Sequence, residues 1–211
     1  MKLVLLCLAV GAVAAQGEPK VAAPAVITLY TQFQVEPPAA VLEGLQSEVD
    51  SIMEPIGLHF EWRNLDGSRG DEVTAELAVV TVKGRCDVAG LGMRSKVEGA
   101  LGFTHISDGQ ILPFAELNCD RLRNFVQVEL LSLPAEEREP ALGRALGRVL
   151  AHEMYHIFAN TTKHGSGITK ESYSVHDLMG DEFQFQHKET LVLRAGRERA
   201  LSEPSNSPGS M

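Results

Sequence analysis

The residues with the clearest chemical pattern are His152, Glu153 and His156, in the motif His-Glu-Met-Tyr-His. Side chains four apart lie on one face of a helix, so the two histidines can bind one Zn²⁺ together. Glu153 follows the first histidine and can act as general base toward a zinc-bound water. An apolar helix gains nothing from burying such a group, because each unpaired polar group costs about 1–3 kcal/mol. The motif therefore predicts one catalytic zinc ion.

A third protein ligand must come from outside the motif, since catalytic zinc sites have three protein ligands and one open position. His164 is the favoured candidate, because it lies eight residues after the second motif histidine in a glycine-bearing loop from which the chain can turn back. A carboxylate at Glu171 or Asp177, or the imidazole of His176, is an alternative ligand. His105 is a candidate for substrate contact.

The motif lies near the end of a segment with helical periodicity. We expect this helix to follow a charged approach at residues 130–140 and to end at Asn160, because asparagine tolerates the left-handed conformation that closes helices. Its apolar stripe holds both motif histidines and comprises Leu142, Ala145, Val149, His152, His156 and Ala159. A final helix is expected at residues 174–199.

The preceding segments predict a sheet backed by a helix. Strands are expected at residues 25–34, 58–63 and 77–82, with a helix at 39–53. Residues 101–117 read as a hairpin, because Asp108-Gly109 separates two apolar runs. Pro113 favours an edge position for this hairpin, where an extended peptide can pair with the sheet.

The N-terminus is typical of a secretory signal peptide at residues 1–15. Lys2 is followed by a thirteen-residue apolar run that ends in small residues and is shorter than the ~20 residues of a membrane span. We therefore expect a secreted or periplasmic protein with one domain at residues 16–200 and a disordered tail at 201–211. Cys86 and Cys119 then form a disulfide or remain as two buried thiols.

The net charge of the chain limits which classes of partner it can bind. Removal of Lys2 leaves 18 basic and 28 acidic residues, a net charge of −10. Without a basic cluster or basic amphipathic helix, we expect no nucleic-acid partner and no membrane association after signal cleavage. We expect a monomer that acts on a peptide or protein.

The motif, the later histidine and a methionine further on resemble the metzincin group of zinc metallopeptidases, a branch of the zincins. That group has the pattern H-E-x-x-H-x-x-G-x-x-H and a methionine-containing turn below the metal. Here Ala159 replaces the glycine, His164 comes two residues late, giving HExxH-x7-H, and Asp181 stands where the turn has tyrosine. Asn160 offers the chain reversal instead.

The resemblance implies an α+β metzincin-like fold, a single domain whose twisted mixed sheet has an edge hairpin, a backing helix and an active-site helix. It further implies that His152, His156 and His164 are zinc ligands, that Glu153 is the catalytic base and that Met179 is the methionine of the turn. Tyr173 is a candidate for stabilising the oxyanion or supporting the site. The expected function is an exported zinc metallopeptidase. The alternatives are a zinc hydrolase with Glu171 or Asp177 as third ligand, and a non-catalytic exported binding module on the same scaffold.

Overall fold

The computed structural model describes residues 26–70, 74, 76–92 and 98–202 of the 211-residue chain. The predicted signal peptide at residues 1–15 lies outside the described residues, as does the predicted tail except for Leu201 and Ser202, which end a helix. Among the helices of the described part, none combines the length and the apolar character that crossing a bilayer requires.

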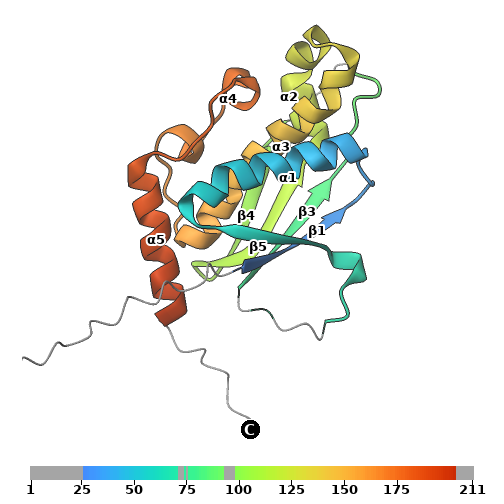
Figure 1. Ribbon diagram of the computed structural model, residues 1–211. Coiled ribbons are helices and arrows are strands. Elements are labelled where there is room, and N and C mark those ends of the chain that lie inside the picture. The colour runs from blue at the N-terminus through green and yellow to red at the C-terminus, as the bar shows by residue number, and fades with distance from the viewer. Residues whose placement is uncertain (1–25, 71–73, 75, 93–97, 203–211) are drawn as a thin grey trace, which may run out of the picture.

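Five strands form one mixed sheet in the order β2-β1-β3-β5-β4 (Figure 1). The parallel strands are β1 (Val26–Phe33), β2 (His59–Asn64), β3 (Leu77–Lys83) and β5 (Gln110–Asn118). The edge strand β4 (Gly102–Ser107) pairs antiparallel with β5. The mixed sheet with an edge hairpin is therefore confirmed.

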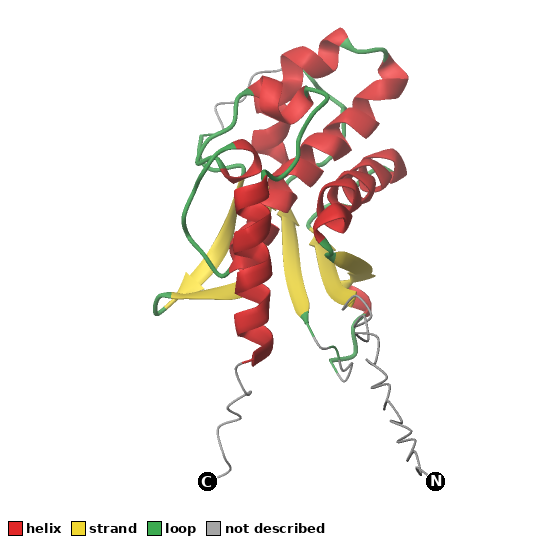
Figure 2. Cartoon of the chain, turned by 60° about the vertical axis from the view of Figure 1, so that its left-hand side comes forward, coloured by secondary structure: helices red, strands yellow, loops and turns green. Residues whose placement is uncertain are grey.

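The helices are α1 (Ala39–Met53), α2 (Cys119–Ser132), α3 (Ala135–Ala159), α4 (Val175–Met179) and α5 (His187–Ser202). Short 3₁₀ helices lie at Glu54–Ile56, Leu65–Gly67 and Gly167–Thr169. Figure 1 shows α1 and α3 side by side over the sheet, and α5 packs against α3 (Figure 2). This is a single α+β domain with a backing helix and a motif-bearing helix, as predicted.

The hairpin follows from its sequence. Asp108 and Gly109 both have positive φ, 50° and 77°. A two-residue hairpin turn requires such angles if its twist is to match that of the strands. Pro113 has no N–H to donate to a ladder, and β5 pairs with β3 only from Phe114 onward. Pro113 therefore lies before the part of β5 that pairs with β3, at the register shift of the β4–β5 ladder.

Two helix predictions in the C-terminal half are wrong, and one helix was not predicted. No element was expected directly after the hairpin, where α2 forms with the Asn118 side chain accepting a hydrogen bond from the Arg121 N–H. The supposed charged approach is the first part of α3, which continues through Pro140. The expected helix at 174–199 is two helices, because Ser174 and Asp177 form a capping box that starts α4 and Gly180 ends it.

The sheet and the helices α1, α2 and α3 enclose the core. Its fully buried members come from the inward faces of the strands and from the facing sides of these helices: Ile27, Leu29, Ala78, Val80, Leu117, Val41, Leu45, Val49, Leu122, Leu142, Leu146 and Leu150. Residues 141–159 of α3 are buried almost all round rather than along one stripe. This helix is therefore the centre of the packing.

Glycines bring α1 and α3 into backbone contact. A Cβ on Gly143 would lie 2.3 Å from the Val41 carbonyl oxygen and 3.0 Å from the Gly44 Cα. A Cβ on Gly147 would lie 2.9 Å from the Leu45 carbonyl oxygen. The colliding atoms are backbone atoms of α1, so an added methyl group must separate the helices.

We therefore expect Gly143→Ala to destabilise the protein by about 1–3 kcal/mol, because overpacking outweighs the gain of up to ~1 kcal/mol in helix propensity. Urea unfolding followed by circular dichroism measures the difference. Gly67→Ala is the control, since a Cβ there has nothing within 4 Å. A Gly143→Ala protein as stable as the wild type would contradict close packing of the two helices.

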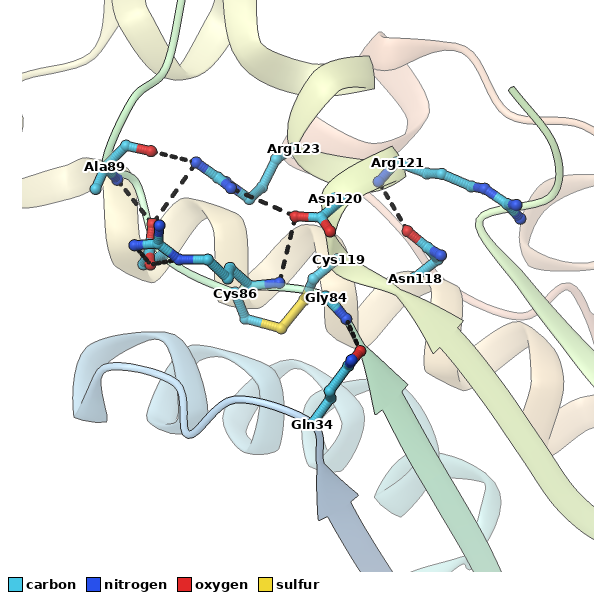
Figure 3. A network of polar contacts seen from close by, with 11 residues as sticks. Gln34, Gly84, Cys86, Ala89, Asn118, Cys119, Asp120, Arg121 and Arg123 are labelled. Atoms are coloured by element: carbon cyan, nitrogen blue, oxygen red, sulfur yellow. Dashed lines mark hydrogen bonds and ion pairs between the residues drawn. A yellow bond between two sulfur atoms is a disulfide. The ribbon is translucent and has the colours of Figure 1, made fainter. Parts of the chain in front are cut away.

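A disulfide joins Cys86, which follows β3, to Cys119 at the start of α2, with a Cα–Cα distance of 5.1 Å (Figure 3). Next to it, the Gly84 N–H donates to Gln34 Oε1 at 2.8 Å and the Arg85 N–H donates to Asp120 Oδ1 at 3.3 Å. The bond therefore ties the end of the parallel sheet to α2.

Replacing both cysteines with serine should lower the free energy of unfolding by about 4 kcal/mol, from the chain entropy of a loop of 33 residues. The measurement is denaturant unfolding of the oxidised wild type and the double variant. Dithiothreitol should lower the denaturant midpoint of the wild type and leave that of the double variant unchanged. Equal stability of the two proteins would show that the bond does not constrain the unfolded chain.

Candidate metal centre

The motif side chains lie on the buried part of α3. His152, Glu153 and His156 are each more than nine-tenths buried. Ionised groups are costly in such surroundings unless they are paired, and neutral polar groups need hydrogen-bond partners. The partners of the three side chains therefore define what the site can do.

Both histidines donate a ring N–H to a backbone carbonyl. His152 Nδ1 is 2.7 Å from the Ile168 oxygen, and His156 Nδ1 is 2.7 Å from the Thr161 oxygen. A carbonyl only accepts, so Nδ1 carries the proton and Nε2 carries a lone pair in each neutral ring. Metal-binding histidines are held in the same way in many proteins, because the carbonyl fixes the tautomer and the ring orientation.

The two Nε2 atoms face each other at 3.0 Å. Burial lowers the pKa of His152 to about 4, although the bond to Ile168 raises it, and burial also lowers the pKa of His156. Both rings are therefore neutral near pH 7, and two lone pairs point at one another without a proton between them. A metal cation between these nitrogens relieves that repulsion, so the donor set fits zinc.

His164 completes a group of three histidines. The ligand atoms of His152, His156 and His164 all lie within 4.8 Å of one another, and no other such group is found among the described residues. The His164 ring stacks on His152 at 5.4 Å between centroids and lies edge-on to His156 at 4.9 Å. Unlike the other two, His164 is exposed.

One loop both supports the motif histidines and carries the third. Asn160 closes α3 in the left-handed conformation, with φ 47° and ψ 55°, as predicted. The turn brings the Thr161 carbonyl back to His156. Further on, buried Ile168 and Thr169 anchor the loop, and the Gly165 N–H donates to the Thr169 carbonyl at 2.8 Å.

Glu153 is held by the edge strand. The Thr104 hydroxyl donates to Glu153 Oε2 at 2.8 Å, and a Cβ on Gly102 would lie 3.0 Å from Glu153 Oε1. A side chain at position 102 would press on the ends of the Leu117, Val149 and Glu153 side chains. Burial raises the pKa of Glu153 to about 7, although the Thr104 bond lowers it. A carboxyl group with this pKa is suited to exchange protons near neutrality.

An open cleft of about 290 Å³ runs between β4 and α3. Its lining includes the motif side chains together with Phe103, Thr104, Ile106, His164 and Glu171. A second hollow of about 250 Å³ shares His152 and Glu153 with the cleft and is lined by Phe125, Val149 and Tyr173. The motif is thus reachable from solvent and has space on two sides.

The alternative ligands differ in their surroundings. Glu171 is exposed and lines the cleft, but it does not belong to the close group of ligand atoms. Asp177 Oδ1 accepts from Lys170 Nζ, and Oδ2 accepts from the Ser174 N–H and hydroxyl. Burial alone would raise the pKa of Asp177, but these bonds lower it to about 2. One Asp177 oxygen therefore pairs with Lys170, and the other takes part in the capping of α4.

The remaining candidates lie around the site. Tyr173 donates its hydroxyl to the Ile168 carbonyl and lies 2.9 Å from His152 Nδ1, and burial raises its pKa. Met179 ends α4 and packs, half-buried, against the core. His105 is exposed, and its ring lies 5.0 Å from that of Phe103.

Sequence reasoning missed Thr104 and the two carbonyls of Thr161 and Ile168. Successive side chains of a strand point to opposite faces, so Gly102 and Thr104 share one face and His105 lies on the other. This alternation could have indicated Thr104. The carbonyls carry no sequence signal, since every residue has one.

Comparison with known proteins identifies a distant structural likeness. The crystal structure of archaemetzincin from Methanopyrus kandleri superimposes with a TM-score of 0.46 and 12% sequence identity, over 83% of this chain and 96% of that one. No family model matches the sequence, and no curated protein sequence matches it significantly.

We expect the purified protein to bind one equivalent of zinc. His164→Ala should release it or weaken binding by at least ~10-fold, because two histidines alone leave an incomplete site. Glu171→Ala, which changes a residue of the same cleft outside the histidine group, should retain the metal. Elemental analysis and competition with a chromophoric chelator measure both. Loss of zinc from Glu171→Ala alone would assign the third ligand to Glu171.

Proposed function

We propose that this protein is an exported zinc-dependent metallopeptidase. The observation that carries the proposal is the convergence of two neutral imidazole nitrogens at 3.0 Å, beside His164 and next to a buried carboxylate in an open cleft. A purely structural zinc site prefers four protein ligands and needs no base. The arrangement of three histidines with Glu153 favours a catalytic site over a non-catalytic binding module.

We assign His152, His156 and His164 as ligands of one zinc ion. When bound, zinc supplies a Lewis acid that polarises a carbonyl and makes a coordinated water acidic, with a pKa near ~7. The Nδ1 bonds to Thr161 and Ile168 hold the first two rings in the ligating tautomer. Glu171 remains the alternative third ligand, because it lines the same cleft.

Glu153 is the proposed general base. Its carboxylate takes a proton from the attacking water and passes it to the leaving amine. Thr104 orients the carboxylate through the bond to Oε2, and burial raises the pKa of Glu153 above the usual range of a carboxyl group. Tyr173 donates to the Ile168 carbonyl, so we assign it to support of His152 rather than to the oxyanion. Met179 is assigned to packing below the site.

A peptide is the proposed substrate because of the strand beside the cleft. β4 is the last strand of the sheet and pairs with β5 along one side only. An extended peptide can pair with the other side of such a strand, which places its carbonyl groups along the cleft. Export rests on the apolar N-terminal segment of the sequence.

Glu153→Gln should retain zinc and lose cleavage of an unstructured protein such as casein by about 10²–10⁴-fold, because the amide cannot accept the proton. Release of peptides from labelled casein measures the rate. Glu137→Gln is the matched control, since Glu137 is an exposed glutamate on the same helix. Equal cleavage by wild type and Glu153→Gln, with zinc bound to both, would remove Glu153 from the mechanism.

A further inference from the structure

A buried carboxylate without a partner lies behind the loop that carries His164. Glu189, in the first turn of α5, is 5% exposed, and its Oε2 has no hydrogen-bond partner. A buried carboxylate that stays unpaired is costly in free energy. We therefore expect a hydrogen-bond donor near this carboxylate. Glu189 has no role in the proposed mechanism.

Glu189 lines a small cavity together with the third histidine. This cavity has a volume of about 150 Å³, and its lining includes Glu189, His164, Gly165, Tyr155, Lys163 and Lys188. A Cβ on Gly165 would lie 3.3 Å from Glu189 Oε1, so the carboxylate packs on the backbone directly after His164. A cavity of this volume is large enough for a bridging water.

His164 lacks the partner that the other two histidines have. The Nδ1 atoms of His152 and His156 each donate to a carbonyl. Within the described part of the chain, no hydrogen bond is formed by either ring nitrogen of His164. When one nitrogen of this ring binds a metal, the other carries an N–H that needs an acceptor. An unmatched donor and an unmatched acceptor thus line the same cavity.

We infer that Glu189 is the positioning residue of His164: its carboxylate accepts the free ring N–H, directly or through one water, when His164 binds the metal. The inference rests on the proposed zinc site. The hydrogen bond fixes the orientation of the exposed imidazole, and the negative charge increases the basicity of the ligating nitrogen. An exposed loop histidine can then bind as firmly as the two buried on α3.

The other polar groups at the cavity do not satisfy Glu189. Lys163 and Lys188 are exposed, and neither forms an ion pair with it within the described part of the chain. Burial, and to a smaller extent the charge of Glu189, raise the pKa of the Tyr155 hydroxyl. Thr161 and Thr169 also line the cavity, and the Thr169 hydroxyl donates to the Ser166 carbonyl. His164, in its proposed role as a metal ligand, supplies a donor with a fixed orientation.

A double-mutant cycle on the full mature protein tests the inference. Zinc affinity is measured by chelator competition for wild type, Glu189→Gln, His164→Ala and the double variant. We expect Glu189→Gln to weaken zinc binding by about 10–100-fold in the wild-type background. In the His164→Ala background the same change should alter affinity by less than about twofold, because the coupled partner is gone. Equal losses in both backgrounds, or no loss in either, would overturn the inference.

Controls separate positioning from general stability. Lys188→Gln changes a charge at the same cavity and should leave zinc affinity within about twofold of wild type; a loss equal to that of Glu189→Gln would overturn the inference. The melting temperature in EDTA should not fall in Glu189→Gln, since glutamine keeps the shape and removes a buried charge. If that variant folds poorly, Glu189→Asp, which keeps the charge, should bind zinc more tightly than Glu189→Ala; equal affinities would again overturn it.

The outcome for the wild type separates the two proposals. A wild-type protein that binds less than about half an equivalent of zinc would contradict the proposed function itself. A wild type that binds zinc through His164, with Glu189→Gln unaffected, would contradict the role of Glu189 alone.

Discussion

The structure depends on the burial of one helix that carries several polar side chains. α3 contacts α1, α2, α4, α5 and the β4–β5 hairpin, so every polar group on its second half must find a partner in a neighbouring element. Arg148 is the clearest example. Its guanidinium donates to Glu48 on α1 at 2.6 Å and to the Asp177 carbonyl on α4 at 2.9 Å, and it lies over the Phe183 ring. A buried pair of this kind does not itself imply net stabilisation, but removing one member leaves an uncompensated charge.

The same requirement explains the shape of the site. The loop after Asn160 returns to α3 twice, once at Thr161 and once at Ile168, and each return supplies a carbonyl to one histidine. The edge strand satisfies Glu153 through Thr104. All three polar side chains are therefore fixed by groups from other elements. Such preorganisation would reduce the cost of ordering these side chains when a ligand binds.

The disulfide also helps to position the elements around the site. It fixes the start of α2, where the Asn118 N–H donates to the Leu101 carbonyl and Arg121 donates to the Ala100 carbonyl. These contacts hold the segment that enters β4 and lines the cleft. The chain just before β4 is therefore held by the start of α2, a helix that the sequence pattern failed to predict. Its exposed apolar residues Val128 and Leu131 obscure the helical stripe.

The sequence by itself determined what local chemistry dictates. The spacing of His152 and His156 places both on one helix face, Asn160 ends that helix, and Asp108-Gly109 turns the hairpin, because each depends only on residues a few positions apart. Tertiary structure alone decided the rest. It set Thr104 rather than His105 against Glu153, engaged Asp177 in a cap, and placed Glu189 behind His164. These outcomes depend on which elements pack together, and that is a property of the whole core rather than of any single segment.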